Sequence, residues 1–259
     1  MTSADGPGRA AVRPAVLRAS AVENTALEKD RERALALTPV SRETLARLDR
    51  FVALLLERQS QINLIAPSTA PTLWTRHVAD SLQLLALAPE ARVWADFGSG
   101  AGFPGLVIAC ALADLADAQV HLVESSAKKA AFLRDAAQAV SAPVVVHAAR
   151  VADFVKAPPA GIEAVTARAF APLSELLREA YPLLIRGAVG LFPKGQAVEA
   201  ELTEAAKCWT LQATLAVSRT DPRGRIVVVR GLQPLAGASR RKGSHKGSPH
   251  RKRPARGRR

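Results

Sequence analysis

Three glycines at alternate positions follow an apolar stretch of the chain. Residues 93–97 have the composition of a buried strand, and Gly98, Gly100 and Gly102 come directly after it. Glycine allows a backbone to adopt positive φ and to approach a bound ligand closely. Pro104 then suits the first turn of a helix, where the missing N–H of proline is no loss. A strand, a glycine-rich loop and a helix in this order predict a nucleotide-cofactor site at the carboxyl end of a parallel sheet.

The glycine spacing leaves the identity of the cofactor open. Gly98-x-Gly100-x-Gly102 is the pattern expected for S-adenosylmethionine (SAM), whereas Gly100-x-Gly102-x-x-Gly105 also satisfies the dinucleotide pattern. The next apolar run ends at Glu124, whose carboxylate can accept hydrogen bonds from both ribose hydroxyls of either cofactor. The loop and the acid therefore predict a ribose-containing cofactor without choosing between SAM and NAD.

The elements expected after residue 92 favour SAM. Strands are expected at residues 93–97, 119–124, 143–147, 162–167 and 187–192, and helices at 104–115, 127–140, 172–184 and 196–206. The runs at 209–217 and 225–229 are joined by a short turn-like segment, so they should pair antiparallel. We therefore expect an α/β fold with a mostly parallel sheet, helices on both faces and an antiparallel C-terminal hairpin. A dinucleotide fold would instead continue with a second βαβαβ half, so the hairpin shifts the balance from NAD to SAM.

Helices are expected before the sheet. Ser41 can cap a helix whose leucines and valines recur at spacings of three and four, and a second helix should cover residues 73–87. Residues 38–90 would then form a helical cap on a core at 91–235. The cap and the core together make one domain at 38–235.

The two ends of the chain have different compositions from this domain. Residues 236–259 contain ten Lys or Arg and no Asp or Glu, so this segment supplies ten of the thirteen formal net positive charges of the 259-residue chain. With almost nothing apolar to bury, it is expected to be a disordered basic tail that contacts RNA. Residues 1–37 are also expected to be a disordered extension, and their arginine-rich start leaves an organelle transit peptide open.

The two cysteines help to define the compartment. Cys110 and Cys208 lie in apolar contexts without metal-ligand spacing, and two buried thiols fit a reducing cytoplasm better than a disulfide framework. No apolar run of the sequence reaches the length of a membrane span. We expect a monomeric cytoplasmic protein with no membrane contact and no metal.

Arg168 follows the fourth expected strand, where it should reach the sulfonium end of SAM. Enzymes that methylate an exocyclic amine usually carry a polar residue, two prolines and an aromatic there, and methylation of a pyrimidine carbon needs a cysteine nucleophile. This chain has neither arrangement. Guanine N7 carries a free lone pair, so its methylation needs alignment and little acid–base chemistry. An arginine could grip a phosphate or guanine O6, although the same site could bind any anionic substrate.

Five separated motifs then point to one family. They are Asn63-Leu64, Arg76-His77-Val78-Ala79-Asp80-Ser81, Gly98-Ser99-Gly100-Ala101-Gly102-Phe103-Pro104-Gly105, Ala167-Arg168-Ala169-Phe170-Ala171 and Pro193-Lys194-Gly195. In this order they resemble the 16S ribosomal RNA guanine-N7 methyltransferase family, also called RsmG or glucose-inhibited division protein B. The resemblance covers residues 40–232.

The resemblance implies a Rossmann-like, SAM-dependent methyltransferase with a small helical N-terminal extension. Its partner would be 16S rRNA or the small ribosomal subunit, and its target a guanine of the decoding region. By matching position, the expected cofactor-binding residues are Gly98, Gly100, Gly102, Phe103, Glu124, Ser125, Val151, Ala152 and Arg168. Glu124-Ser125 stands where the family often has Asp-Ser. Ala152 replaces a frequent Glu, so any adenine contact there would come from the backbone.

The resemblance also suggests which residues meet the substrate. Arg150, Arg168 and Arg225 match family arginines that are suspected of holding substrate, and we treat them as the catalytic candidates. Asn63, His77 and Lys194 are the further substrate-binding candidates. Purely structural roles stay open for these three residues. Asn63 could simply lie near a helix end, His77 could form a hydrogen-bonded pair with Asp80, and Lys194 could be a solvated loop residue.

Two other functions remain open on the sequence. An NAD-linked oxidoreductase could use the same glycine loop, and it would retain NAD and leave SAM unbound. A non-catalytic RNA-binding protein could carry its charge in the tail, and it would bind rRNA equally well with or without the cofactor pocket.

Overall fold

We describe the fold from a computed structural model of the chain. It describes the backbone of residues 13–235 and the side chains from residue 25 onward. The expectations for residues 1–12 and for the basic tail at 236–259 lie outside the described residues.

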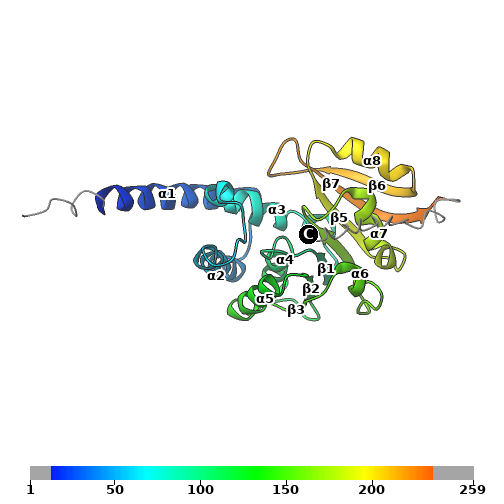
Figure 1. Ribbon diagram of the computed structural model, residues 1–259, viewed down its shortest axis with the longest axis horizontal. Coiled ribbons are helices and arrows are strands. Elements are labelled where there is room, and N and C mark those ends of the chain that lie inside the picture. Colours follow the sequence, from blue (N-terminus) through cyan, green and yellow to red (C-terminus); the bar gives the residue numbers. More distant parts are fainter. Residues whose placement is uncertain (1–12, 236–259) are drawn as a thin grey trace, which may run out of the picture.

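A seven-stranded sheet forms the centre of the molecule (Figure 1), with the strand order β3-β2-β1-β4-β5-β7-β6. Its strands are β1 (Val93–Phe97), β2 (Gln119–Val123), β3 (Val144–His147), β4 (Ala164–Ala167), β5 (Val189–Lys194), β6 (Trp209–Val217) and β7 (Arg225–Pro234). The first five are parallel, and β7 lies antiparallel between β5 and β6. The predicted parallel sheet with an antiparallel C-terminal hairpin is therefore confirmed.

Helices cover both faces of this sheet. One apolar cluster includes α4 (Gly105–Leu112), α5 (Ala127–Ala139) and the face of β1 that carries Trp94. The other cluster includes α6 (Val151–Phe154), α7 (Leu173–Leu184), α8 (Val198–Ala206) and the opposite face of β1, with Ala95 and Phe97. Successive side chains of a strand point to opposite faces, so the uninterrupted apolar runs of the sequence form two cores.

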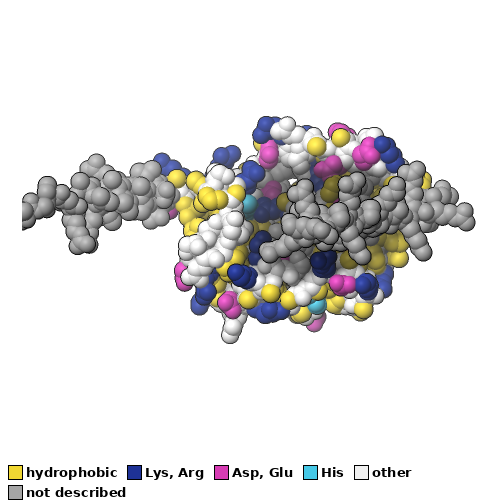
Figure 2. All heavy atoms as spheres, in the orientation of Figure 1, with side chains coloured by type: hydrophobic (Ala, Val, Ile, Leu, Met, Phe, Trp, Pro, Cys, Tyr) yellow, Lys and Arg dark blue, Asp and Glu magenta, His cyan; other side chains and the backbone are white. Residues whose placement is uncertain are grey.

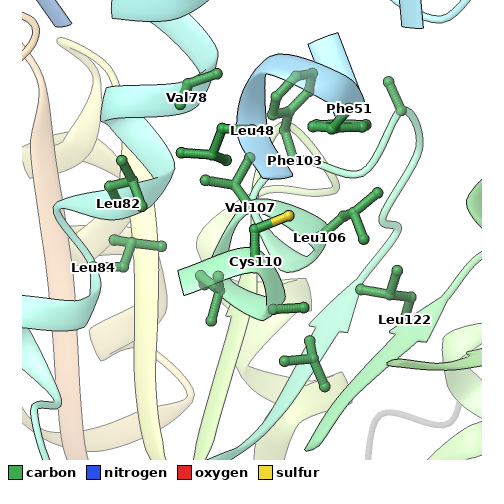
Figure 3. Packing of buried hydrophobic residues seen from close by; sticks show 14 of the residues in the cluster. Leu48, Phe51, Val78, Leu82, Leu84, Phe103, Leu106, Val107, Cys110 and Leu122 are labelled. Carbon is green, nitrogen blue, oxygen red and sulfur yellow. The ribbon is translucent and has the colours of Figure 1, made fainter. Parts of the chain in front are cut away.

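The first of these clusters also includes a helical cap. Its elements are α2 (Arg42–Arg58), η1 (Pro67–Thr72), η2 (Trp74–Ala79), α3 (Asp80–Leu82) and η3 (Leu85–Leu87). Figure 3 shows Leu48 and Phe51 of α2 beside Phe103 and Val107, so α2 packs on the segment that follows the glycine loop. Ser41 caps α2 as predicted, because its hydroxyl accepts a hydrogen bond from the Thr44 N–H at 3.1 Å.

The expectation of a single regular helix at 73–87 is wrong. The backbone makes a π-helical segment, η2, before the short α3, and then a 3₁₀ turn, η3. The Ser81 hydroxyl donates to the His77 carbonyl at 2.5 Å, a side-chain bond that competes with regular backbone pairing and bends helices. Irregular π-helical turns are frequent at functional sites.

The disorder expected for residues 1–37 is wrong for Arg13–Leu37, which forms α1. Figure 1 shows α1 reaching beyond the rest of the described chain, with its C-terminal half beside η1 and η2. Ala34 is buried there, and Arg31 pairs with Asp49 at 2.7 Å and lies 5.4 Å from the centre of the Trp74 ring. α1 has little amphipathic pattern of its own, and the residues that it contacts are distant in sequence. The sequence alone therefore did not predict this helix.

A buried carboxylate anchors α1. The Asp30 carboxylate accepts hydrogen bonds from the Thr75 N–H at 3.0 Å and the Thr75 hydroxyl at 2.5 Å. Asp30→Ala leaves these donors unpaired and should lower the free energy of unfolding by about 1–3 kcal/mol, measured by urea denaturation. Glu32→Ala, at an exposed position of the same helix, should change it little. Equal stability of the two variants would contradict the anchoring role.

The described residues also bear on the expectation about the cysteines. Cys110 is buried, but Cys208 is exposed, so the expectation of two buried thiols is wrong for Cys208. Within residues 13–235, no helix is long and apolar enough to cross a membrane.

Candidate functional site

A cavity of about 1160 Å³ opens at the carboxyl ends of β1 and β4. The strand order reverses there, because the chain proceeds from β1 to β2 and β3 on one side and continues with β4 and β5 on the other. Open α/β sheets bind their ligands outside the carboxyl ends of the strands at this switch point. The loop after β1, the segment after β4, η2 and the loop before β7 all line the cavity.

The glycine loop has the backbone that the sequence predicted. Gly98, Gly100 and Gly102 have φ values of +69°, +55° and +98°, a region that other residues rarely adopt. A Cβ at Gly102 would lie 3.1 Å from both Leu106 and Phe51, so α2 and α4 pack close to the loop. Gly98 and Gly100 line the cavity, which leaves their backbone accessible to a ligand.

A buried carboxylate lies beneath the loop. Asp96 is fully buried, and its Oδ2 accepts a hydrogen bond from the Gly105 N–H at 3.0 Å. Burial raises the pKa of Asp96 to about 6, against the opposing hydrogen bonds of Ser99 and Gly105. The carboxylate thereby fixes the start of α4 to the end of β1. Sequence reasoning missed this residue, although an acid within a buried strand was the signal that could have found it.

Glu124 joins the end of β2 to the same loop. Its carboxylate accepts hydrogen bonds from the Gly100 N–H at 2.9 Å and the Ser126 N–H at 2.7 Å. The side chain is 8% exposed, so the two backbone donors hold it in one position beside the glycine loop. Each carboxylate oxygen retains a second acceptor site, which is compatible with the predicted contact to ribose hydroxyls.

Arg168 lies across the switch point from the glycine loop. Its guanidinium donates to the Arg76 carbonyl at 3.0 Å and to His77 Nδ1 at 2.7 Å, and lies 3.6 Å from Asp80 Oδ2. It also lies 5.5 Å from the centre of the Phe103 ring. Burial lowers the pKa of Arg168 from its ordinary value, but a guanidinium stays protonated at neutral pH. The η2–α3 segment therefore holds a fixed cation at the end of β4.

His77 positions this cation. The ring is buried, stacks on Phe103 at a centroid distance of 5.0 Å and lies 3.2 Å from the Thr69 hydroxyl through Nε2. Burial and the neighbouring Arg168 and Arg76 lower the pKa of His77 to about 3. The neutral ring can then accept from Arg168 through Nδ1 and donate to Thr69 through Nε2.

The hydrogen-bonded pair considered for His77 and Asp80 does not form. Asp80 Oδ1 instead accepts from Gln83 at 2.8 Å and from the Thr220 hydroxyl at 2.7 Å. His77 and Asp80 are therefore joined through Arg168, and Asp80 also ties η2–α3 to the loop before β7. Sequence spacing could not reveal this, because Arg168 and Thr220 are 88 and 140 residues beyond Asp80.

The low pKa of His77 predicts a pH effect on stability. Folding favours the neutral form of His77. The contribution of His77 to stability is therefore complete above pH 6.5, its ordinary pKa, and is lost as pH falls toward 3. Between pH 7 and 5 the wild type should lose on the order of 2 kcal/mol more free energy of unfolding than His77→Asn, which keeps an acceptor for Arg168.

Urea titrations of both proteins at the two pH values measure this difference. His121, whose pKa burial and His147 lower to about 4, and Asp96, whose pKa is raised to about 6, are present in both proteins. Their contributions therefore cancel in the comparison. Parallel losses of stability in the wild type and in His77→Asn would show that His77 is not held neutral.

Lys194 and Arg225 line the cavity but differ in their pairing. Lys194 donates to Glu201 at 2.7 Å and to the Ala171 carbonyl at 2.9 Å, so its charge is already neutralised by an ion pair. Arg225 donates only to the carbonyls of Pro222 and Gly224 among the described residues, and forms no ion pair there. Arg225 is therefore the better candidate for an anionic substrate.

Several predicted site residues lie outside this cavity. Arg150 is exposed at the start of α6, beyond the outer strand β3, and the structure does not bring it to Arg168 and Arg225. Val151 is buried while Ala152 is exposed at the same place, and Ser125 is exposed after β2. Asn63 is also exposed and does not line the cavity, although the next residue, Leu64, does.

The cavity walls carry excess positive charge. Figure 2 shows Lys and Arg side chains, with a His beside them, between the helical part and the sheet. Of the lining cations, Arg168, Lys194 and Arg223 have carboxylate partners, whereas Arg33, Arg76 and Arg225 form no ion pair within the described part of the chain. Unpaired arginines around a cavity favour an anionic substrate, and arginine matches phosphate geometry.

The comparison with known proteins decides the family. Residues 44–234 match the family described as GidB, rRNA small subunit methyltransferase G. The chain belongs to this family.

Curated relatives agree with this assignment over most of their length. The ribosomal RNA small subunit methyltransferase G of Bradyrhizobium sp. strain BTAi1 is 57% identical over 208 residues, which cover 80% of this chain and 94% of the relative. The protein of the same name from Nitrobacter hamburgensis is 59% identical over 198 residues, which cover 76% of each chain. The predicted resemblance is therefore confirmed, and the oxidoreductase alternative is wrong.

Solved structures are similar in fold. A putative O-methyltransferase from Klebsiella pneumoniae is 14% identical with a TM-score of 0.50, and the match covers 81% of this chain and 99% of that one. A cofactor-bound protein from MTB is 16% identical with a TM-score of 0.51, covering 70% of this chain and 89% of that one. At this identity the likeness concerns the fold alone, which is that of a Rossmann-like methyltransferase.

SAM is the cofactor of this methyltransferase family, and the residues at the switch point fit it. Gly98 and Gly100 would present backbone to SAM, and Glu124 lies beside them with acceptor sites to spare. When bound, SAM supplies a methyl group carried on a positively charged sulfur. The chain itself supplies the loop, the fixed Arg168 and the surrounding arginines.

Proposed function

We propose that this chain transfers the methyl group of SAM to N7 of a guanine in the decoding region of 16S rRNA. The observation that carries the proposal is the fixed guanidinium of Arg168, which stands opposite the glycine loop in a cavity without a free base. Guanine N7 offers a lone pair at neutral pH, so no proton has to be removed before the methyl group is accepted.

The engagement of the acidic and basic side chains supports this chemistry. His77 is neutral, but both of its nitrogens have partners. The carboxylates that line the cavity all accept hydrogen bonds; they are Asp30, Asp80, Glu201 and Asp221. Asp96 is buried beneath the loop. A reaction that depends on alignment rather than proton transfer suits such a site.

Arg168 would act through the edge of the base that carries N7. Guanine presents N7 and O6 side by side as acceptors, and arginine commonly donates to both. A donor on N7 would block the lone pair, so Arg168 must donate to O6 or to a neighbouring phosphate. Its anchoring by Arg76, His77 and Asp80 restricts how the guanidinium can turn, which supports such a selective contact.

The proposal also includes the RNA partner and the cellular compartment of the reaction. The unpaired Arg33, Arg76 and Arg225 would hold rRNA phosphates at the rim of the cavity. We place the reaction in the cytoplasm, with a monomer acting on rRNA or on the small subunit. The predicted roles of Asn63, Ser125, Arg150, Val151 and Ala152 remain predictions.

Mapping the modified base tests the function directly. Small-subunit rRNA from cells with the gene should contain a 7-methylguanosine that is missing without it, as measured by mass spectrometry of RNA fragments. Reintroducing the wild-type gene should restore the modification, whereas a variant altered at Arg168 should not. A methyl group at another base atom, or unchanged rRNA after deletion, would overturn the proposal. If the Arg168 variant restored the modification, Arg168 would not have the proposed role in methyl transfer.

A further inference from the structure

Phe170 is an aromatic ring that the reaction described above does not use. It is 39% exposed, and it is the only exposed aromatic side chain among the residues whose burial the structure describes. The ring lines the cavity, two residues after Arg168. An exposed aromatic that lines a charged cavity is poorly placed for the hydrophobic core, which points to a role in binding.

The backbone around Phe170 is held in an unusual conformation. Ala169 has φ of +51°, a left-handed value that residues other than glycine adopt at a conformational cost. On the other side, the Ala171 carbonyl accepts a hydrogen bond from Lys194, whose ammonium is paired with Glu201. Such strain persists where the surrounding contacts fix the segment, and here it presents the ring to the cavity.

Phe170 also rests against the cofactor loop. A Cβ at Gly98 would lie only 2.6 Å from Cδ2 of the ring, so only glycine leaves room for it. The ring therefore connects the segment after β4 to the loop after β1. Arg168 and Gly98, which flank it, are the fixed cation and the candidate contact to SAM.

We propose that Phe170 is the platform on which the target base stacks while it accepts the methyl group. This inference rests on the proposed function and adds a residue to it. A base within folded RNA is hidden from an enzyme by its neighbours, and unstacking it is unfavourable unless the protein replaces those contacts. An aromatic face can replace the stacking contacts of any base. Arg168, two residues before Phe170, would contact the edge of the same base.

The alternative is that Phe170 only packs on the loop at Gly98. The two roles differ in which side chains can replace phenylalanine. Stacking needs a planar π face, so Tyr should serve and Leu should not. Packing needs apolar volume, so Leu should serve, and any loss should appear in cofactor affinity.

The test compares Phe170→Leu, Phe170→Tyr and Ile185→Ala with the wild type on small ribosomal subunits. Ile185 is an exposed apolar residue beyond α7 and serves as the control. Transfer of tritium from labelled SAM into rRNA is measured irrespective of the accepting base. S-adenosylhomocysteine affinity is measured by calorimetry. Phe170→Leu should lower kcat/KM by roughly 10- to 100-fold, as expected for the loss of one base–aromatic stack.

The expected pattern has three further parts. Phe170→Tyr and Ile185→Ala should stay within about 3-fold of the wild type, and S-adenosylhomocysteine should bind all four proteins alike. Wild-type activity in Phe170→Leu, or a loss of activity matched by a loss of cofactor affinity, would overturn the stacking role. The modified base is mapped separately. A methyl group away from guanine N7 would overturn the proposed function, whereas the variants would still decide whether Phe170 stacks on the base that is modified.

Discussion

Replacing Arg168 with alanine should lower kcat for methyl transfer by about 100-fold or more, comparable to the loss of one preorganised donor at an active site. The guanidinium is held by the Arg76 carbonyl, His77 and Asp80, so its position is set before substrate arrives. S-adenosylhomocysteine affinity should change far less than turnover. Arg168→Lys should recover only part of the rate, because an ammonium lacks the planar fork that reaches several acceptors at once.

The control for this experiment is Arg178→Ala, which removes an exposed arginine from α7. Circular dichroism and urea unfolding should accompany the kinetics, since Arg168→Ala also removes the partner of His77 and Asp80. Turnover equal to that of Arg178→Ala would contradict the role of Arg168 in alignment. A fall in activity that follows only the fraction unfolded would assign Arg168 to structure instead.

The parts of the fold that the sequence predicted are those with local signals. The glycine loop, the capping serine of α2 and the turn between β6 and β7 each depend on residues close together in the chain. Continuous apolar runs between the expected helices predicted the strands of the sheet, because a buried parallel strand is apolar on both faces. The element order then placed the loop after β1 and Arg168 at the same switch point.

The contacts that the sequence could not predict join distant segments. Asp30 and Thr75 anchor α1 across 45 residues, and His77 meets Arg168 across 91. In both cases the partner that defines the role of the residue lies far along the chain, so this role becomes visible only when the elements are packed. The same argument applies to Arg150, which matched family arginines by position but lies beside the outer strand β3, away from the cavity.

Lys194 shows how a motif can be placed correctly while its ion-pair partner stays hidden in the sequence. The motif at the end of β5 lies at the cavity, as expected, but Glu201 on α8 neutralises the lysine. The ion pair instead supports the segment that carries Phe170, through the Ala171 carbonyl. Sequence could not place Glu201 there, because its partnership depends on the packing of α8 against α7.

Replacing Gly100 with aspartate should lower the affinity for S-adenosylhomocysteine by about 100-fold or more, an effect of roughly 2.7 kcal/mol. The Gly100 N–H donates to Glu124, so the new carboxylate would stand beside an existing one at the predicted ribose contact. Like charges at this distance repel, and the added side chain enters space that the ligand needs. The fold should survive, because a Cβ at Gly100 meets only the Gly98 carbonyl at 3.7 Å, and aspartate tolerates positive φ better than most residues.

Gly161→Asp provides the matched control for this prediction. Gly161 has φ of +78° and nothing within 4 Å of an added Cβ, so the substitution introduces the same charge and a similar backbone strain away from the cavity. Its calorimetric titration should match that of the wild type. If Gly100→Asp also bound the ligand as the wild type does, with an unchanged circular dichroism spectrum, the glycine loop would not be the cofactor site. If both variants lost affinity equally, backbone strain or net charge would explain the loss, and the local contact of Gly100 with Glu124 would not.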